Sequence, residues 1–363
     1  MRLLTCYGTA RVSACHAPSQ WRLERNTIMR RSRLLALGCI AGSAFLLAAC
    51  GGGGAGQAPT ADSAGNYKLT ELDATTSLLN VPTYAAQQSG AQFHIAITTT
   101  SVTGGGTANQ EFAGGTGNVL VAGVDSPMRI DQQGVTDMTV LGSIAQTNVW
   151  VLVAKKGSNI HSLADLRGKT IGVSGAGAVS DIALRYELIK AGVSPSSTKI
   201  VALGAAPSQL AALQGGHADA VQLLSPTLEA AIKDNQVQIV ADFRKENYPA
   251  LVLSARTSDV RSNPKAFCAY MGAVKSSMTK VMNDHTYATQ MASSLMGSAY
   301  TSAQIQTVLT DYVQNRYDPT LTFTQTQYDT AKSLLIGSGV VKGQNFPTYQ
   351  DLTQHQPKCG PSA

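Results

Sequence analysis

IHSLADLRGKTIGVSGAGAVSDIALRYELIKAG, residues 160–192, is the stretch that decides the fold class. Its middle, 169–175, reads as a short apolar strand that ends in a turn of small residues. A segment with helical spacing follows at 183–192 and stops at a glycine, as helices often do. A strand that passes through a turn into a helix is the repeating unit of parallel sheets. The stretch therefore predicts an α/β fold.

The same alternation of short strands and helical segments extends in both directions from this stretch. Another helix that ends in glycine is predicted at 207–216, and the chain from about Pro264 onward reads mainly as helices. We predict strands at 68–75, 93–100, 118–127, 138–146, 148–156, 169–175, 199–204, 219–226 and 237–243. The fourth and fifth of these strands follow each other closely and read as antiparallel neighbours. The rest of the pattern is typical of parallel sheets covered by helices on both faces.

Three segments carry a family resemblance. SLADLRGK at 162–169 leads into a strand, and Gly215, HADA at 217–220 and Pro226 follow at the next helix and strand. These residues resemble the substrate-binding proteins of bacterial ABC importers, in the branch that serves sulfonates, nitrate, taurine and thiamine precursors. AGGTGNVLVAGVDSP, 113–127, is similar to the segment of the family's first lobe that ends near the ligand.

The resemblance covers roughly residues 70–285, and it has one departure. TYAAQQSGAQFHI, 83–95, lacks the aromatic segment that family members usually carry between the first helix and the second strand. The transfer of ligand-binding residues is therefore weaker in the first lobe than in the second.

The resemblance implies a bilobal, type II periplasmic-binding-protein fold, an α/β architecture of two mixed sheets flanked by helices and joined by a two-crossing hinge. The roughly 300 residues that follow residue 65 exceed the usual size of one hydrophobic core, which also favours two lobes. We expect residues 66–153 and 250–345 to form lobe 1, 154–249 to form lobe 2, and 346–363 to form a C-terminal tail. Ligand would bind between the lobes.

The N-terminal region reads as a leader. The apolar run Leu34–Ala49 follows several arginines, and its 16 residues fall short of the about 20 that span a bilayer. A basic start, an apolar core and small residues before a break indicate a secretory signal. We expect a leader over 1–49, with the signal at 29–49 and the true start at Met29.

LAAC at 47–50 resembles the bacterial lipobox, in which the leader is cut before a cysteine that then carries lipid. The alternative is an ordinary signal peptide with a chance cysteine. The small residues at 51–65 suit a flexible linker between Cys50 and the folded chain. These features place the protein in the periplasm or at the cell surface, anchored to a bacterial membrane by lipid on Cys50.

The net positive charge of the chain comes from this leader. The full sequence carries a net charge of +6, but residues 51–363 retain 21 of the 28 Lys and Arg and 21 of the 22 Asp and Glu. No cluster of basic residues remains that would follow a phosphate backbone, so a nucleic-acid partner is not expected.

Three of the six cysteines, Cys50, Cys268 and Cys359, remain after the cut. Cys268 and Cys359 either pair as a disulfide in an oxidising compartment or stay as two free thiols. No spacing typical of a zinc site is present, and we expect no metal and no cofactor.

The turn after the strand at 169–175 is the first candidate ligand site. Free N–H groups at a helix start, helped by the helix dipole, favour an anion, and glycines let a ligand approach the backbone. The candidate residues are Ser174, Gly175, Ala176 and Gly177. A plain strand-to-helix turn is the alternative.

Other candidates lie at predicted strand ends, where ligands bind in open α/β sheets. Each also has a structural alternative, namely helix capping or packing at the hinge. The candidates are Thr75, Thr76, Ser126, Trp150, Ser225 and Tyr248, with Asp125 either as a cap or as a partner for a ligand amine.

Catalysis finds little support, because the sequence has no HExxH spacing and no GxSxG elbow. We expect a monomeric, non-enzymatic solute-binding component of an ABC importer. It would capture a small anionic or heteroaromatic solute, such as a sulfonate, nitrate, taurine or a thiamine precursor, and deliver it to a permease with a cytoplasmic ATPase. The alternatives are a ligand-binding lipoprotein of a signalling system and an enzyme of the type that makes the thiamine pyrimidine.

Overall fold

The computed structural model of the chain describes residues 58–341 and 345–360. The predicted leader, Cys50 and most of the predicted linker lie outside these residues. Within the described part, no helix combines the length and the apolar character needed to cross a bilayer.

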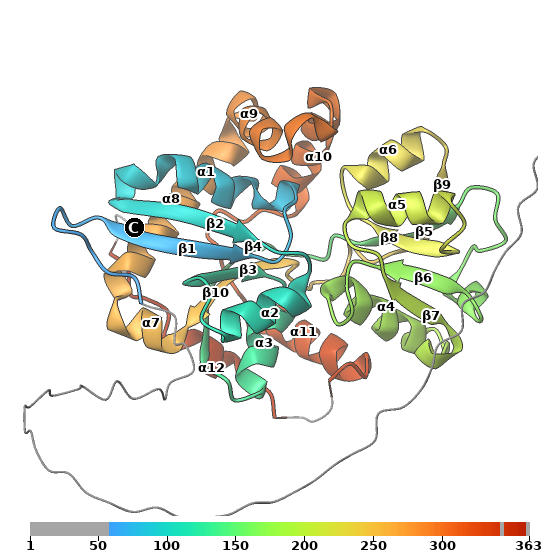
Figure 1. Cartoon of the computed structure of the whole chain (residues 1–363), viewed down its shortest axis with the longest axis horizontal. Helices are drawn as coiled ribbons and strands as arrows, with labels where there is room; N and C mark the ends of the chain where they lie inside the picture. The colour runs from blue at the N-terminus through green and yellow to red at the C-terminus, as the bar shows by residue number, and fades with distance from the viewer. Residues whose placement is uncertain (1–57, 342–344, 361–363) are drawn as a thin grey trace, which may run out of the picture. The chain divides into compact units, whose positions relative to one another are not determined.

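In the part of the chain that the structure describes, ten strands form two separate five-stranded sheets (Figure 1). The first sheet has the order β2 (Ile95–Ser101), β1 (Tyr67–Asp73), β3 (Val119–Ala122), β10 (Leu251–Arg256) and β4 (Met138–Ala145). The second has the order β7 (Lys199–Ala202), β6 (Thr170–Val173), β8 (Ala220–Leu223), β5 (Val151–Lys155) and β9 (Val237–Asp242).

The two sheets share one plan. In each, three neighbouring strands run parallel, and the fourth strand is antiparallel to both of its neighbours. That fourth strand is β10 in the first sheet and β5 in the second, and each begins just after the chain has come from the other sheet. The chain crosses between the sheets at 146–150 and again at 243–250.

Helices pack on both faces of each sheet, as the alternating sequence pattern predicts. The helices that accompany the first sheet are α1 (Val81–Ser89), α2 (Gly105–Ala113), α3 (Asp125–Gln132), α7 (Thr257–Ser262), α8 (Pro264–Asn283), α9 (His285–Met296), α10 (Ser302–Asn315), α11 (Gln325–Gly337) and α12 (Tyr349–Thr353). Those of the second are α4 (Val179–Lys190), α5 (Ala206–Gln214) and α6 (Thr227–Lys233). In Figure 1, α1 and α8 cover one face of the first sheet, and α2 and α3 cover the other.

Local sequence explains where the main helices begin. The side chain of Asn263 accepts a hydrogen bond from the N–H of Ala266, and Pro264 occupies the first turn of α8. Thr301 and Gln304 form a capping box at α10. The prediction of helices after Pro264, and of helices over most of 183–192 and 207–216, is confirmed.

All nine predicted strands are present, but one predicted pairing is wrong. β4 and β5 are not antiparallel neighbours, because β5 lies in the second sheet between β8 and β9. The short polar link between the two strands is the first crossing, and no hairpin forms there. Residues 151–153, which we assigned to lobe 1, therefore belong to a strand of the second sheet, and the exact lobe boundaries stay a proposal. β10 was not predicted.

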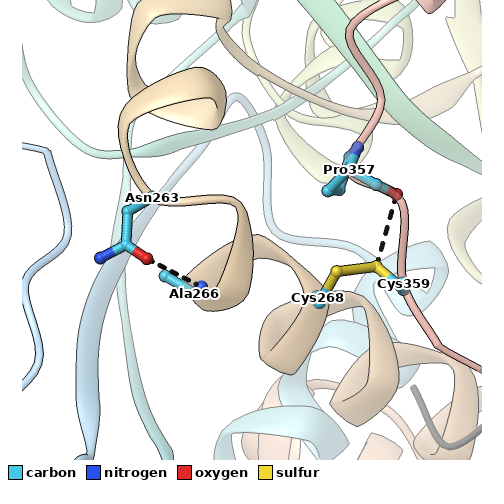
Figure 2. The surroundings of a disulfide bond; sticks show 5 residues. All are labelled: Asn263, Ala266, Cys268, Pro357 and Cys359. Carbon is cyan, nitrogen blue, oxygen red and sulfur yellow. Dashed lines mark hydrogen bonds between the residues drawn. A yellow bond between two sulfur atoms is a disulfide. The ribbon is translucent and has the colours of Figure 1, made fainter.

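The C-terminal tail is tied to α8 by a disulfide between Cys268 and Cys359, whose Cα atoms lie 5.3 Å apart (Figure 2). The bond joins residues 91 positions apart in the sequence. It connects the tail after α12 to the long helix that covers the first sheet.

Candidate functional site

A cavity of about 440 Å³ lies at the carboxyl ends of the parallel strands of both sheets. The first sheet contributes the residues after β1, β2 and β3, and the second those after β6, β7 and β8. Val149, Trp150 and Ala250 come from the crossings, Leu251 begins β10, Met296 ends α9, and Ala299 and Tyr300 follow it. Carboxyl ends of strands are where ligands bind in open α/β sheets.

Hydroxyl groups dominate the polar lining of the cavity. They belong to Thr75, Thr76, Ser77, Ser101, Thr103, Ser126, Ser174, Ser225, Thr227 and Tyr300. Among the described lining residues Asp125 alone carries a charge, and none is Lys, Arg, His or Cys. The lining also has a large apolar share, which includes Leu79, Val102, Trp150, Val179, Leu224 and Met296.

Helix N-termini face the same space. The residues that precede α2, α4, α5 and α6 line the cavity, namely Gly104, Ala178, Ala205 and Pro226, and so do the first two residues of α3. The first turn of a helix has unpaired N–H groups and a partial positive charge. The cavity is therefore suited to an anion although no basic side chain lines it among the described residues.

Buried polar contacts hold the wall after β1. The carboxyl of Asp73 accepts hydrogen bonds from the N–H of Thr75 at 3.2 Å and from Nδ2 of Asn80 at 3.0 Å. Ser77 and Asn80 form a capping box, and the hydroxyl of Thr76 donates to that of Ser101 at 3.1 Å. Burial raises the pKa of Asp73 to about 8. These contacts fix the backbone at Thr75 and the hydroxyls of Thr76 and Ser77.

Asp125, the first residue of α3, is 2% exposed at the cavity floor. Its Oδ1 accepts a hydrogen bond of 2.9 Å from the hydroxyl of Tyr248, and its Oδ2 lies 3.6 Å from Nη1 of Arg129. Burial raises the pKa of Asp125, against the opposing effects of Arg129 and Tyr248. Both carboxyl oxygens thus have protein partners.

Hydrogen bonds to the first turn of α4 hold the turn after β6. The hydroxyls of Ser174 and Ser180 lie 2.7 Å apart, and the N–H of Gly177 donates to Oδ2 of Asp181 at 2.8 Å. Ser174 lines the cavity, but Gly175, Ala176 and Gly177 do not. Of the four residues of this turn that we predicted to hold an anion, Ser174 belongs to the cavity lining, and the anion contact stays a prediction.

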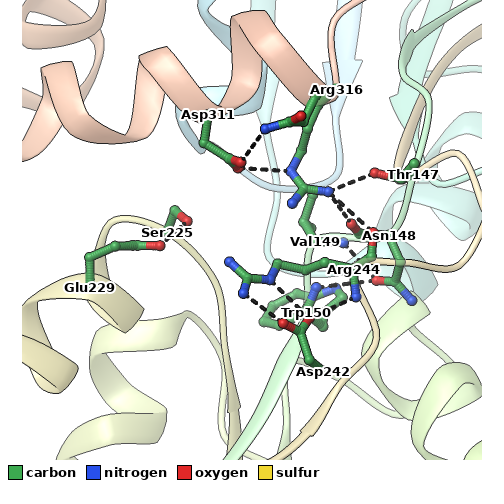
Figure 3. Close-up of polar contacts among 11 residues, drawn as sticks. Thr147, Asn148, Val149, Trp150, Ser225, Glu229, Asp242, Arg244, Asp311 and Arg316 are labelled. Carbon is green, nitrogen blue, oxygen red and sulfur yellow. Dashed lines mark hydrogen bonds and ion pairs between the residues drawn. The ribbon is translucent and has the colours of Figure 1, made fainter.

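The first crossing is held by Asn148 and Arg316 (Figure 3). Oδ1 of Asn148 accepts from the N–H groups of Val149 and Trp150, at 2.8 and 3.2 Å. Arg316 donates to the hydroxyl of Thr147 at 2.6 Å and to the carbonyl of Asn148 at 2.9 Å. These bonds fix the backbone that presents Trp150 to the cavity.

The structure brings six of the ten predicted ligand-binding residues into the cavity lining: Thr75, Thr76, Ser126, Trp150, Ser174 and Ser225. It places four outside the lining: Gly175, Ala176, Gly177 and Tyr248. Tyr248 is fully buried beneath the cavity and contacts Asp125, which corresponds to the packing alternative.

Sequence reasoning missed three groups of lining residues. Those after β2 (101–105) and β7 (204–207) follow from the same strand-end rule, applied to every predicted strand. Met296 and Tyr300 had no such signal, because they lie about 200 residues from the first wall and reach the cavity from the end of α9. The hydroxyl of Tyr300 lies 2.9 Å from that of Thr227.

No group of three or more His, Cys, Asp or Glu within 58–341 and 345–360 is arranged to hold a metal ion.

Comparison with known families decides the assignment. A family model described as NMT1/THI5 like matches residues 81–288, more than half of the chain. The chain belongs to the NMT1/THI5-like family. The matched residues include every strand from β2 to β10 and most of the cavity lining. No curated protein matches the chain.

Solved structures similar to this NMT1/THI5-like chain share its fold. The alkanesulfonate-binding protein SsuA from Xanthomonas axonopodis pv. citri, bound to MOPS, has a TM-score of 0.63 and 17% identity, over 76% of this chain and 95% of that chain. The periplasmic nitrate-binding protein NrtA from Synechocystis PCC 6803 has a TM-score of 0.60 and 13% identity, over 80% and 84%.

A third similar structure is a mutant of DszB in complex with biphenyl-2-sulfinic acid, with a TM-score of 0.58 and 16% identity, over 80% of this chain and 96% of that chain. At these identities the likeness concerns the fold. It confirms the prediction of a periplasmic-binding-protein fold with two mixed sheets flanked by helices.

Proposed function

We propose that the chain is the solute-binding component of an ABC importer, which captures a small anionic solute between its two lobes and delivers it to a permease. The observation that carries the proposal is the cavity between the two sheets, lined by hydroxyls and by the starts of several helices. Such a site binds an anion through hydrogen bonds and helix dipoles and needs no fixed cation.

The size and the apolar share of the cavity narrow the ligand. A volume of about 440 Å³ falls in the range of about 300–1,000 Å³ typical of pockets for drug-sized molecules. A nitrate ion has four atoms and would leave most of this space empty. We infer that the ligand is an organic anion, such as a sulfonate or carboxylate, with an apolar body.

In this proposal the six lining residues divide into two groups. Thr75, Thr76, Ser126, Ser174 and Ser225 hold the anionic group, and Trp150 packs against the apolar body. The hydroxyls of Thr76 and Ser225, which donate to Ser101 and Glu229 in this structure, turn to the anion when it binds. An enzymatic role has less support, because the described lining lacks the Cys, His or Lys that would act as nucleophile or base.

The rest of the proposal concerns the place of the protein. We propose that lipid on Cys50 anchors the protein to a bacterial membrane as a monomer, in the periplasm or at the cell surface, beside its permease. The support is the LAAC motif at 47–50 and the small-residue linker that follows it. Labelled fatty acid incorporated by the wild type, and not by a Cys50→Ala variant, tests this part.

The test of ligand class is a thermal-shift panel of alkanesulfonates, taurine, nitrate, aromatic carboxylates and thiamine pyrimidines. A ligand at a hundred times its Kd stabilises a protein by about 2.7 kcal/mol. We expect the largest shifts from sulfonates or carboxylates with apolar bodies. A response to pyrimidines alone would contradict the proposed anion site.

A further inference from the structure

The turn at 175–177, which does not line the cavity, contacts the other lobe. Arg129 on α3 donates a hydrogen bond of 2.6 Å from Nη1 to the carbonyl of Gly177. α3 packs on the first sheet, whereas Gly177 follows β6 of the second. The bond therefore joins the two lobes directly beside the cavity, whose lining includes Asp125 on one side and Ala178 on the other.

The shape of the turn fits this contact. Gly177 has a φ of +67°, and a Cβ at this position would lie 3.3 Å from Nη2 and 3.4 Å from Nη1 of Arg129. The N–H of Gly177 is held by Asp181 of α4. The turn thus presents its carbonyl to the guanidinium while α4 fixes it from behind.

A further glycine allows the lobes to approach at the same place. A Cβ on Gly123 would collide with Cγ2 of Val179, whereas a Cβ on Gly106 would meet the carbonyl oxygen of Ala176 at an ordinary contact distance of 3.6 Å. Gly123 and Gly106 lie next to the starts of α3 and α2 on the first lobe. The contact is therefore a close-packed seam of small residues with one charged hydrogen bond.

The same nitrogen of Arg129 also lies near the ligand site. Its Nη1 is 3.6 Å from Oδ2 of Asp125, the one charged side chain in the described lining. A carboxylate in that position would repel an anion unless a cation offset it. Arg129 supplies this cation from behind the lining, and its side chain is only 19% exposed.

We propose that Arg129 is a positioning residue that latches the two lobes over the bound anion, by holding the carbonyl of Gly177 and by offsetting the charge of Asp125. The inference rests on the proposed function, since closure of the lobes serves capture of a solute. It assigns the turn at 175–177 to the contact between lobes rather than to the ligand.

The latch predicts a specific kinetic effect. A ligand leaves after the lobes open, so loss of a closing contact raises the dissociation rate more than it lowers the association rate. With sodium hexane-1-sulfonate as the probe, we expect Arg129→Ala to dissociate at least about tenfold faster, in line with the usual worth of a hydrogen bond to a charged group. Arg129→Lys keeps the charge but not the planar fork, so its rate should fall between the two.

The matched control is Arg261→Ala, which removes an exposed arginine of α7 on the same lobe. A double-mutant cycle of Arg129→Ala with Gly177→Ala separates a shared contact from two independent effects. We expect the double variant to dissociate little faster than Arg129→Ala alone. Additive effects, or an unchanged rate in Arg129→Ala, would overturn the latch.

The same double-mutant cycle can also be measured by urea unfolding without ligand. This measurement tests the contact between the lobes independently of the proposed function. If wild type binds no anion of the panel, the proposed function fails, and the unfolding cycle decides the latch alone. A coupling between the two substitutions supports it, and strict additivity overturns it.

Discussion

The hydroxyl of Tyr248 donates a hydrogen bond of 2.9 Å to Oδ1 of Asp125. Tyr248 lies in the second crossing, just before β10, and Asp125 begins α3 at the cavity floor. Burial raises the pKa of both groups. The bond therefore ties the second crossing to the floor of the cavity.

Replacement of Tyr248 by Phe should lower stability. The change leaves a buried carboxyl oxygen of Asp125 without its donor, which costs about 1–3 kcal/mol. Urea unfolding measures the loss. Tyr84→Phe, at a half-buried tyrosine of α1, is the matched control. Equal stability of Tyr248→Phe and wild type would show that the hydrogen bond contributes nothing to the folded state.

A buried carboxyl in the first sheet predicts a dependence of stability on pH. Oε1 of Glu71 accepts from the hydroxyl of Tyr270 at 2.7 Å, and Oε2 accepts from Thr99 at 2.6 Å. Burial raises the pKa of Glu71 from 4.5 to about 7. Between these values the folded state keeps a proton that the unfolded state has released. The contribution of Glu71 is thus fully present below about pH 4.5 and lost as pH rises to about 7.

Glu71→Gln should remove this part of the pH dependence, because glutamine resembles the protonated acid. One pKa unit corresponds to about 1.4 kcal/mol, so wild type should lose about 2–3 kcal/mol more than the variant between pH 5 and 8. Urea unfolding at both pH values measures the difference. Parallel curves for the two proteins would contradict the buried-acid account.

Arg316 should be essential to the hinge. Its side chain is 6% exposed and reaches Thr147, Asn148 and Asp311 (Figure 3). Arg316→Ala leaves buried acceptors unpaired and should cost at least about 2 kcal/mol. The matched control is Arg244→Ala, since Arg244 and Asp242 are 27% and 30% exposed and such pairs contribute about 1 kcal/mol or less. Faster hydrogen exchange at residues 147–150 in Arg316→Ala alone would support the assignment, and similar losses in both variants would contradict it.

The disulfide between Cys268 and Cys359 should stabilise the fold. Closing a loop of 91 residues removes freedom from the unfolded chain and is typically worth about 2–4 kcal/mol. Dithiothreitol should therefore lower the Tm of wild type and leave the variant with serine at both positions unchanged. An unchanged wild-type Tm in dithiothreitol, with both cysteines shown to be reduced, would contradict this role.

The sequence predicted the strands and much of the cavity because local patterns encode both. Apolar runs mark strands, and hydroxyls at strand ends such as Thr75 and Ser126 follow from the rule for open sheets. The pairing of β5 could not be read in this way, since its apolar pattern fits a neighbour in either sheet. The role of Gly177 depends on Arg129, which lies 48 positions away, so a turn motif alone suggested a ligand contact.

The central claim is that the cavity holds an organic anion against Trp150. The chain has two tryptophans, and the other, Trp21, lies in the predicted leader, so the tryptophan fluorescence of a chain that begins after this leader comes from Trp150 in the cavity lining. The most direct measurement is a fluorescence titration with hexane-1-sulfonate, benzoate and the neutral alcohol hexan-1-ol. The account predicts a saturable change with at least one anion, none with the alcohol, and loss of the response in a Thr76→Val, Ser126→Ala variant. A saturable response to the alcohol, or to no anion at all, would contradict it.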